Sequence, residues 1–163
     1  MKTAMAAAAD LTLDHALNKE EREELQRSFA ALKNDSDRHG LNIFIRFFAE
    51  YPEYKKIFPK FRFLTDGEIG SSAELKLHGD IVMTEFGGII SSMNDRAKLA
   101  ETLHRMAHKH KLHHIRSSQV LEILPMILAG LESVEGTPLA PITVAAWTKF
   151  VGHLGHLVET APL

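Results

Sequence analysis

The spacing of apolar residues is the feature that most constrains the fold of this chain. Apolar side chains recur every three to four positions almost throughout, which is the period of an amphipathic helix. No long stretch alternates apolar and polar residues with the period of two that a half-buried strand requires. The chain has no internal repeat and no dividing linker, and its 163 residues suit one domain. We therefore predict an all-α domain over residues 18–163, preceded by a flexible extension over residues 1–17.

Capping residues and prolines predict where several helices begin and end. Asn18 is followed three positions later by Glu21, the spacing of a capping box, and Ser71 precedes a glutamate at the same spacing. Pro52 predicts the end of a helix just before it. Pro125 lies inside an otherwise helical segment and is expected to kink that helix or to delay its start.

Composition excludes several classes of function. The chain has 19 basic and 21 acidic residues, so no strong electrostatic attraction to nucleic acid is expected. No apolar run approaches the roughly 20 residues that a membrane-spanning helix needs. The absence of cysteine removes disulfides, thiolate metal sites and cysteine nucleophiles. The N-terminal MKTAMAAAAD is too short and too weakly apolar for a secretory signal, so we expect a cytoplasmic protein that binds neither nucleic acid nor a membrane.

The segment HRMAHKHKLHH, residues 104–114, contains five histidines and therefore raises the question of a metal site. His104 and His108 are four positions apart, so both project from one helix face and could chelate zinc. No third ligand is evident, and the glutamate of the zinc-protease motif H-E-x-x-H is missing. A solvated helix face is the simpler interpretation of this pair.

Two other histidines occupy positions where a helical stripe requires an apolar residue. His110 follows Leu103, Met106 and Ala107 at the spacing of one helix face. His78 is the polar member of the preceding helix's stripe, whose other members are Leu75, Val82, Phe86, Ile89 and Met93. A single histidine of this kind is usually a core residue, but two on successive helices favour a shared ligand.

Only two histidines on the apolar stripes can coordinate the shared ligand, and this small number limits what the ligand can be. Zinc favours four ligands, and calcium and magnesium favour oxygen, so two imidazoles suit none of them. Haem needs one axial histidine, a large apolar slot and at most one polar group on the open side. His78 and His110, together with the many phenylalanines, supply this arrangement.

From about residue 18 onward, the order of these motifs resembles the globin family. The run FFAEYPEYKKIFPKF is similar to the globin segment in which a proline, here Pro52, opens a short helix and a phenylalanine, here Phe58, follows six residues later. ELKLHGDIV resembles the distal-helix motif, and LHRMAHKH resembles the proximal motif L-x-x-L-A-x-x-H that ends at the iron ligand. Gly40 corresponds to the small residue at which two globin helices cross, opposite Gly79.

The resemblance implies a globin fold of about eight helices around a haem pocket and gives each site residue a role. His110 would be the proximal iron ligand, with His108 as the runner-up, and His78 would be the distal histidine. Phe44 and Val82 would line the distal pocket, and Phe58 would stack on the haem. Met106 and Ile115 would pack beneath the ring. Lys60 and either His113 or His114 would contact the propionates. The cofactor would be haem b, because no C-x-x-C-H motif for covalent attachment is present.

The expected function is reversible binding of dioxygen or other diatomic gases, such as carbon monoxide and nitric oxide, without enzymatic turnover. One alternative is nitric oxide dioxygenase or peroxidase activity with an outside electron donor. Another is a helical interaction or sensor module that has lost its haem. The spacing of His78 and His110, with Phe44 and Val82, resembles neuroglobin-type globins, so we expect His78 to bind the resting ferrous iron. Assembly into a homo-oligomer stays open.

Overall fold

The computed structural model describes residues 16–161, and this part of the chain is built from helices without any strand. It contains eight α-helices and one 3₁₀ helix, which confirms the all-α prediction. The predicted N-terminal extension lies outside the described residues up to position 15, and Leu17 is buried. In chain order the helices are α2 (Lys19–Lys33), α3 (Ser36–Glu50), η1 (Pro52–Ile57), α4 (Asp66–Ile69), α5 (Ala73–Ser91), α6 (Arg96–Leu112), α7 (Ser117–Leu121), α8 (Leu124–Glu135) and α9 (Pro141–Thr160).

The capping prediction is confirmed for α2 and wrong by one residue for α5. Asn18 Oδ1 accepts a hydrogen bond from the Glu21 amide at 2.8 Å, and the Glu21 carboxylate accepts one from the Asn18 amide at 3.0 Å. At α5 the N-cap is Ser72, whose hydroxyl accepts a hydrogen bond from the Leu75 amide at 3.2 Å. The Ser71 hydroxyl instead donates a hydrogen bond to the Glu68 carbonyl oxygen in the preceding short helix α4. The sequence pattern did not reveal this short helix.

The two prolines act as expected. The Tyr51 amide donates to the Phe47 carbonyl at 2.8 Å and closes α3, and Pro52 opens η1. Pro125 lies in the first turn of α8, where its missing N–H costs no helical hydrogen bond. Pro125 therefore delays the start of α8 and leaves α7 as a separate short helix.

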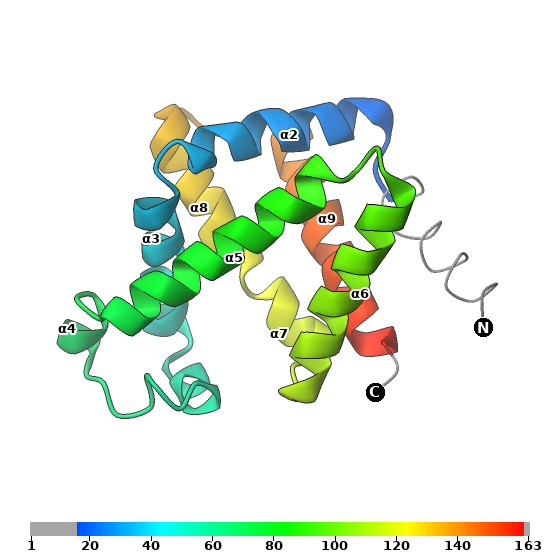
Figure 1. The fold of residues 1–163 in the computed structure, drawn as a ribbon. Helices are drawn as coiled ribbons and strands as arrows, with labels where there is room; N and C mark the ends of the chain where they lie inside the picture. The colour runs from blue at the N-terminus through cyan, green and yellow to red at the C-terminus, as the bar shows by residue number, and fades with distance from the viewer. Residues whose placement is uncertain (1–15, 162–163) are drawn as a thin grey trace.

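Helices α3 and α5 cross in direct backbone contact (Figure 1). A Cβ atom built on Gly40 would lie 2.7 Å from the Gly79 carbonyl oxygen, and one built on Gly79 would lie 2.7 Å from the Gly40 carbonyl carbon. Only glycine at both positions allows this approach, so the predicted crossing is confirmed. Phe44 follows Gly40 by about one turn and His78 directly precedes Gly79, so the crossing brings these two side chains together.

Helix α9 runs behind α5 and α6 and forms the centre of the core (Figure 1). The buried Trp147 donates its indole N–H to the Ser28 hydroxyl of α2 at 2.8 Å. The ring of Phe86 in α5 meets Trp147 and Phe150 edge to face, with ring centroids 6.3 and 6.1 Å away. Side chains from α2, α5 and α9 therefore interlock at one place.

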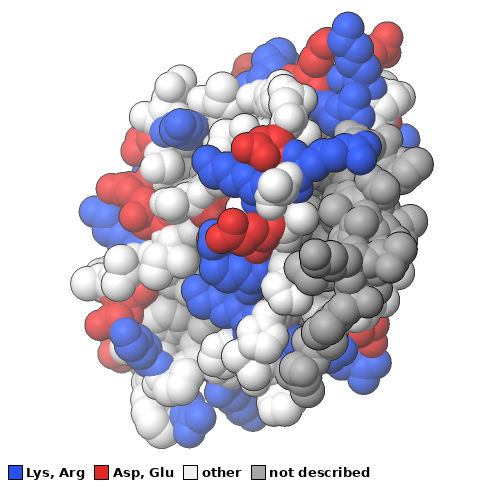
Figure 2. Space-filling model, turned by 45° about the vertical axis from the view of Figure 1, so that its right-hand side comes forward, with Lys and Arg blue, Asp and Glu red and all other residues white. Residues whose placement is uncertain are grey.

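Charged side chains of both signs are interspersed on the face shown in Figure 2, in keeping with the net charge of −2. Over residues 16–161, no helix is both long enough and apolar enough to cross a membrane.

Candidate functional site

His78 projects from α5 into a group of three phenylalanine rings. Its ring centroid lies 4.6 Å from that of Phe44, 5.0 Å from that of Phe58 and 6.1 Å from that of Phe61, each at close to a right angle. Phe44 belongs to α3, whereas Phe58 and Phe61 follow η1. The fold therefore brings together three of the residues predicted from the sequence, namely Phe44, Phe58 and His78, and adds Phe61.

The His78 imidazole is half-buried and makes no side-chain hydrogen bond with any residue between 16 and 161. Burial, and after it the charges of His110 and Lys109, lower the pKa of His78 to about 4. Near pH 7 the ring is therefore neutral, with one N–H donor and one free lone pair. An imidazole held in an apolar wall without a protein partner is available to a ligand.

His110 has its ring orientation and tautomer set by its own helix. Its Nδ1 lies 2.8 Å from the Met106 carbonyl oxygen. Because a carbonyl oxygen can only accept, Nδ1 carries the proton and Nε2 keeps its lone pair. The half-buried His110 follows the buried stripe of Leu103, Met106 and Ala107, as the sequence predicts. Proteins usually orient a metal-binding histidine in this way, with a hydrogen bond from the ring nitrogen that does not bind the metal.

The turn after His110 is fastened to the end of α9. The Ile115 amide donates to the His110 carbonyl at 3.1 Å. The Glu159 carboxylate accepts hydrogen bonds from the Ser117 amide at 3.0 Å and from the Arg116 guanidinium at 2.8 Å. These hydrogen bonds hold the pKa of Glu159 below its ordinary value, and the bond from the Ser117 amide has the largest effect. Glu159 was missed by sequence reasoning, because nothing near it in the chain indicates a partner more than 40 positions away.

The other predicted site residues differ in how far they are buried and in what they contact. Val82 is half-buried, lies one turn after His78 and packs against the core, and Ile115 is also half-buried. Lys60 forms an ion pair with Glu74 at 3.1 Å, with both side chains largely exposed. His113 and His114 are exposed at the end of α6, and His114 has a positive φ of 59°.

His104 and His108 stack with their ring centroids 6.4 Å apart and their planes at 16°. His104 is exposed and His108 is half-buried. In the part of the chain that the structure describes, no three histidine, aspartate or glutamate side chains are close enough to hold a metal ion. This pair therefore has no third protein ligand there.

Glu122, between α7 and α8, is a further polar group that sequence reasoning missed. It faces the Tyr54 hydroxyl and raises the pKa of Tyr54 to about 12, while its Oε2 atom is buried without a hydrogen-bond partner in the described chain. The rings of Tyr51 and Tyr54 stack at 5.4 Å beside it and continue the phenylalanine cluster through Phe47. The Glu122 carboxylate therefore contacts Tyr54 and not the phenylalanine rings that surround His78.

Comparison with known proteins agrees with this arrangement of helices. The family described as Globin matches residues 41–158. A globin of Nerita albicilla is 26% identical over 150 residues, covering 92% of this chain and 96% of that protein. Cytoglobin-1 of Danio rerio is 28% identical over 134 residues, covering 80% of this chain and 76% of that protein. Ferric myoglobin of Aplysia limacina superposes with a TM-score of 0.80 at 21% identity, covering 90% of this chain and 99% of that chain. The chain belongs to the globin family.

Proposed function

We propose that this globin binds one haem b non-covalently between α5 and α6, with Nε2 of His110 as its axial ligand, and reversibly binds dioxygen or another diatomic gas. Haem-based gas binding is the general function of the family to which the chain belongs. The observation that carries the assignment of the ligand is the 2.8 Å contact between His110 Nδ1 and the Met106 carbonyl, which directs a free lone pair away from α6. His104 and His108 stack on each other instead.

The donor set fits haem better than a bare metal ion. When bound, haem supplies an iron that accepts an imidazole on one side and a diatomic gas on the other. Two imidazoles on facing helices and a wall of phenylalanine rings match that requirement, whereas a hard cation would need several oxygen ligands. Phe58, Val82, Met106 and Ile115 would line the apolar slot.

On the distal side, His78 would donate its N–H to bound dioxygen and stabilise the partial negative charge on that ligand. Phe44, packed 4.6 Å from His78, would limit the space beside the gas and exclude water. Carbon monoxide and nitric oxide would use the same pocket. We place the protein in the cytoplasm, where it would store, transport or sense the gas that it binds.

The ligand assignment is tested by haem uptake. The purified full chain should show the absorption spectrum of non-covalent haem b, and His110→Ala should lose stable haem. His104→Ala and His108→Ala are the matched controls and should keep it. Loss of haem in the His108 variant with normal retention in the His110 variant would move the ligand, and a colourless unsubstituted protein would favour an interaction module without haem.

We also propose that His78 itself binds the ferrous iron when no gas is present, so that a gas has to displace it. The lone pair of a neutral His78 and its lack of a hydrogen-bond partner in the described chain support this proposal. Competition of this kind lowers the apparent gas affinity by the fraction of open protein. The deoxygenated ferrous protein should give a low-spin spectrum that becomes high-spin in His78→Leu. A high-spin spectrum of the unsubstituted protein would disprove six-coordination and leave gas binding intact.

The enzymatic alternative, turnover of nitric oxide or peroxide, would need an external electron donor. Rapid mixing of the oxygen-bound protein with nitric oxide, with and without a reductase, measures it. Sustained turnover would establish this activity in place of simple gas binding.

A further inference from the structure

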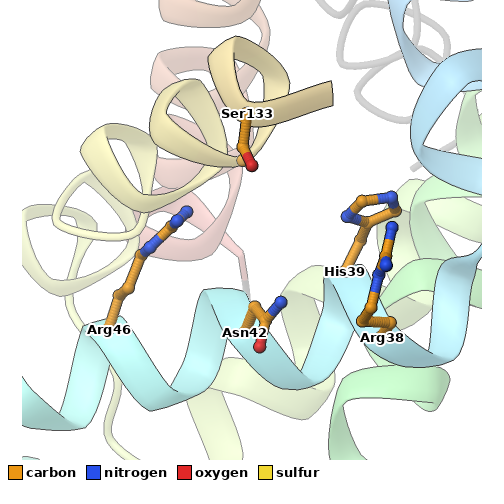
Figure 3. A pocket seen from close by; sticks show the side chains of 6 residues that line it. Arg38, His39, Asn42, Arg46 and Ser133 are labelled. Atoms are coloured by element: carbon orange, nitrogen blue, oxygen red, sulfur yellow. The ribbon is translucent and has the colours of Figure 1, made fainter. Parts of the chain in front are cut away.

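A pocket of about 210 Å³ opens between α3 and α8 (Figure 3). The residues that line it lie on the side of α3 opposite Phe44, because positions 42 and 46 are about half a turn from position 44. The pocket is therefore separate from the haem site. Its lining consists of Arg38, His39, Asn42, Arg46, Gly130 and Ser133.

The α3 wall of the pocket carries two positive charges. Arg38, Asn42 and Arg46 recur every four positions, so their side chains project from one face of the helix toward α8 (Figure 3). Arg38 pairs with Asp35 at 3.1 Å, but both side chains are at least half exposed, so the pair is weakly held in water. Arg46 makes no ion pair or hydrogen bond with residues 16–161. The Arg46 guanidinium is therefore available to a ligand.

His39 adds a neutral donor at the same end as Arg38. Only 8% of the residue is exposed, and its side chain makes no hydrogen bond within the described chain. Burial, and after it the charge of Arg38, lowers the pKa of His39. The imidazole is therefore neutral near pH 7 and offers one N–H donor. Its ring nitrogens are not fully buried, so a ligand in the pocket can reach them.

The opposite wall comes from α8. Ser133 extends its hydroxyl toward α3 between Arg46 and His39 (Figure 3). Gly130 leaves the space beside it free of a side chain, and a Cβ there would meet Ile43 only at 3.7 Å. Donors therefore reach the pocket from two helices and from several directions. Arg38 and His39 also lie in the first turn of α3, where the helix dipole favours negative charge.

We propose that this pocket binds a phosphate group, carried either by inorganic phosphate or by a small organic phosphate monoester. Two guanidinium groups, an imidazole, an amide and a hydroxyl supply donors for the several oxygens of a tetrahedral dianion. A planar carboxylate would use donors on one side only. The volume holds several water molecules, which is room for a phosphate. The inference goes beyond gas binding and does not depend on it.

Isothermal titration calorimetry of the full chain tests the proposal, with inorganic phosphate, phenyl phosphate and acetate as probes. Phosphate should bind saturably and more tightly than acetate, and binding should weaken as ionic strength rises. Arg46→Gln should weaken phosphate binding about tenfold, the effect of losing one charge-assisted contact. The matched control is Arg105→Gln, which removes an exposed arginine from α6, outside the pocket, and should leave binding unchanged.

The outcomes separate the two phosphate sources and the competing explanations. Tighter binding of phenyl phosphate than of inorganic phosphate identifies an organic phosphate as the ligand class, and equal binding identifies the inorganic ion. Ser133→Ala should weaken binding to a smaller extent and gives a second reading if Arg46→Gln disturbs folding. Absence of saturable binding, equal effects of Arg46→Gln and Arg105→Gln, or acetate binding as tight as that of phosphate overturns the proposal.

Discussion

At the scale of single residues, the pairing of Phe44 with His78 decides the character of the distal side. The two rings belong to different helices and meet edge to face with centroids 4.6 Å apart. The phenyl ring excludes water from one side of the imidazole, which is part of the burial that lowers the pKa of His78 to about 4. One residue of α3 therefore limits the space beside a residue of α5 and contributes to its burial.

Phe44→Ala is expected to change the kinetics of gas binding. Removing the ring opens space beside His78, so carbon monoxide should associate faster after flash photolysis. The same substitution leaves a cavity in the core, where Phe44 is 6% exposed, and should lower the free energy of unfolding by about 3 kcal/mol. Phe63→Ala is the control, because the Phe63 ring is 87% exposed and should affect neither quantity. Unchanged association rates in Phe44→Ala would place that residue outside the gas pocket.

At the scale of helices, the crossing of α3 and α5 is the contact on which the site depends. Two glycines let the backbones approach so closely that a Cβ on either would lie within 3.0 Å of backbone atoms of the partner helix. Side chains at the crossing could move aside, but backbone atoms cannot. The separation of α3 and α5, and with it the distance from Phe44 to His78, is fixed by residues that carry no side chain.

Gly40→Ala should lower the free energy of unfolding by about 3 kcal/mol, because the new methyl group forces α3 away from α5. Urea denaturation measures this quantity. Gly88→Ala in α5 is the matched control, since a Cβ there meets nothing within 4 Å. It should leave stability unchanged or raise it by up to about 1 kcal/mol, because alanine favours a helix over glycine. Equal stability of the two variants would contradict the close crossing.

At the scale of the whole molecule, α9 connects the ends of the fold. Lys149 pairs with the carboxylate of Glu21 in the capping box of α2 at 2.6 Å, and Trp147 donates to Ser28 of the same helix. At its other end, Glu159 holds the turn that follows His110. The last helix of the chain therefore fastens the first described helix and supports the orientation of the predicted iron ligand.

Glu159→Gln should reduce stability at neutral pH and have little effect in acid. The folded-state pKa of Glu159 lies below its ordinary value of 4.5, so its charged form stabilises the fold above that pH. This contribution is lost as the pH falls through the folded-state pKa. The difference in Tm between the unsubstituted protein and the variant should therefore be largest at pH 7 and should shrink as the pH falls through the folded-state pKa.

Glu101→Gln, on the exposed side of α6, provides the comparison and should show a smaller difference at pH 7. A difference in Tm between the Glu159 variant and the unsubstituted protein that stays constant from pH 7 to pH 3 would show that the Glu159 charge does not stabilise the turn.

The sequence alone determined those features that depend on near neighbours along the chain. Apolar spacing determined the all-α fold, and the capping residue Asn18 and the helix-breaking Pro52 determined boundaries, because hydrogen bonds within a turn involve residues three or four positions apart. The same spacing identified His78 and His110 as polar members of apolar stripes. The resemblance to globins then brought the distant motifs into one site.

Only the tertiary structure decided the contacts between residues far apart in the chain. The anchoring of the turn after His110 by Glu159 and the meeting of Arg46 with Ser133 across a pocket leave no periodic trace, because each depends on how two helices pack. Ser72 rather than Ser71 caps α5, because the Ser71 hydroxyl already donates a hydrogen bond to the Glu68 carbonyl at the end of α4. Local sequence sets which face of a helix a residue occupies, and packing sets what that face meets.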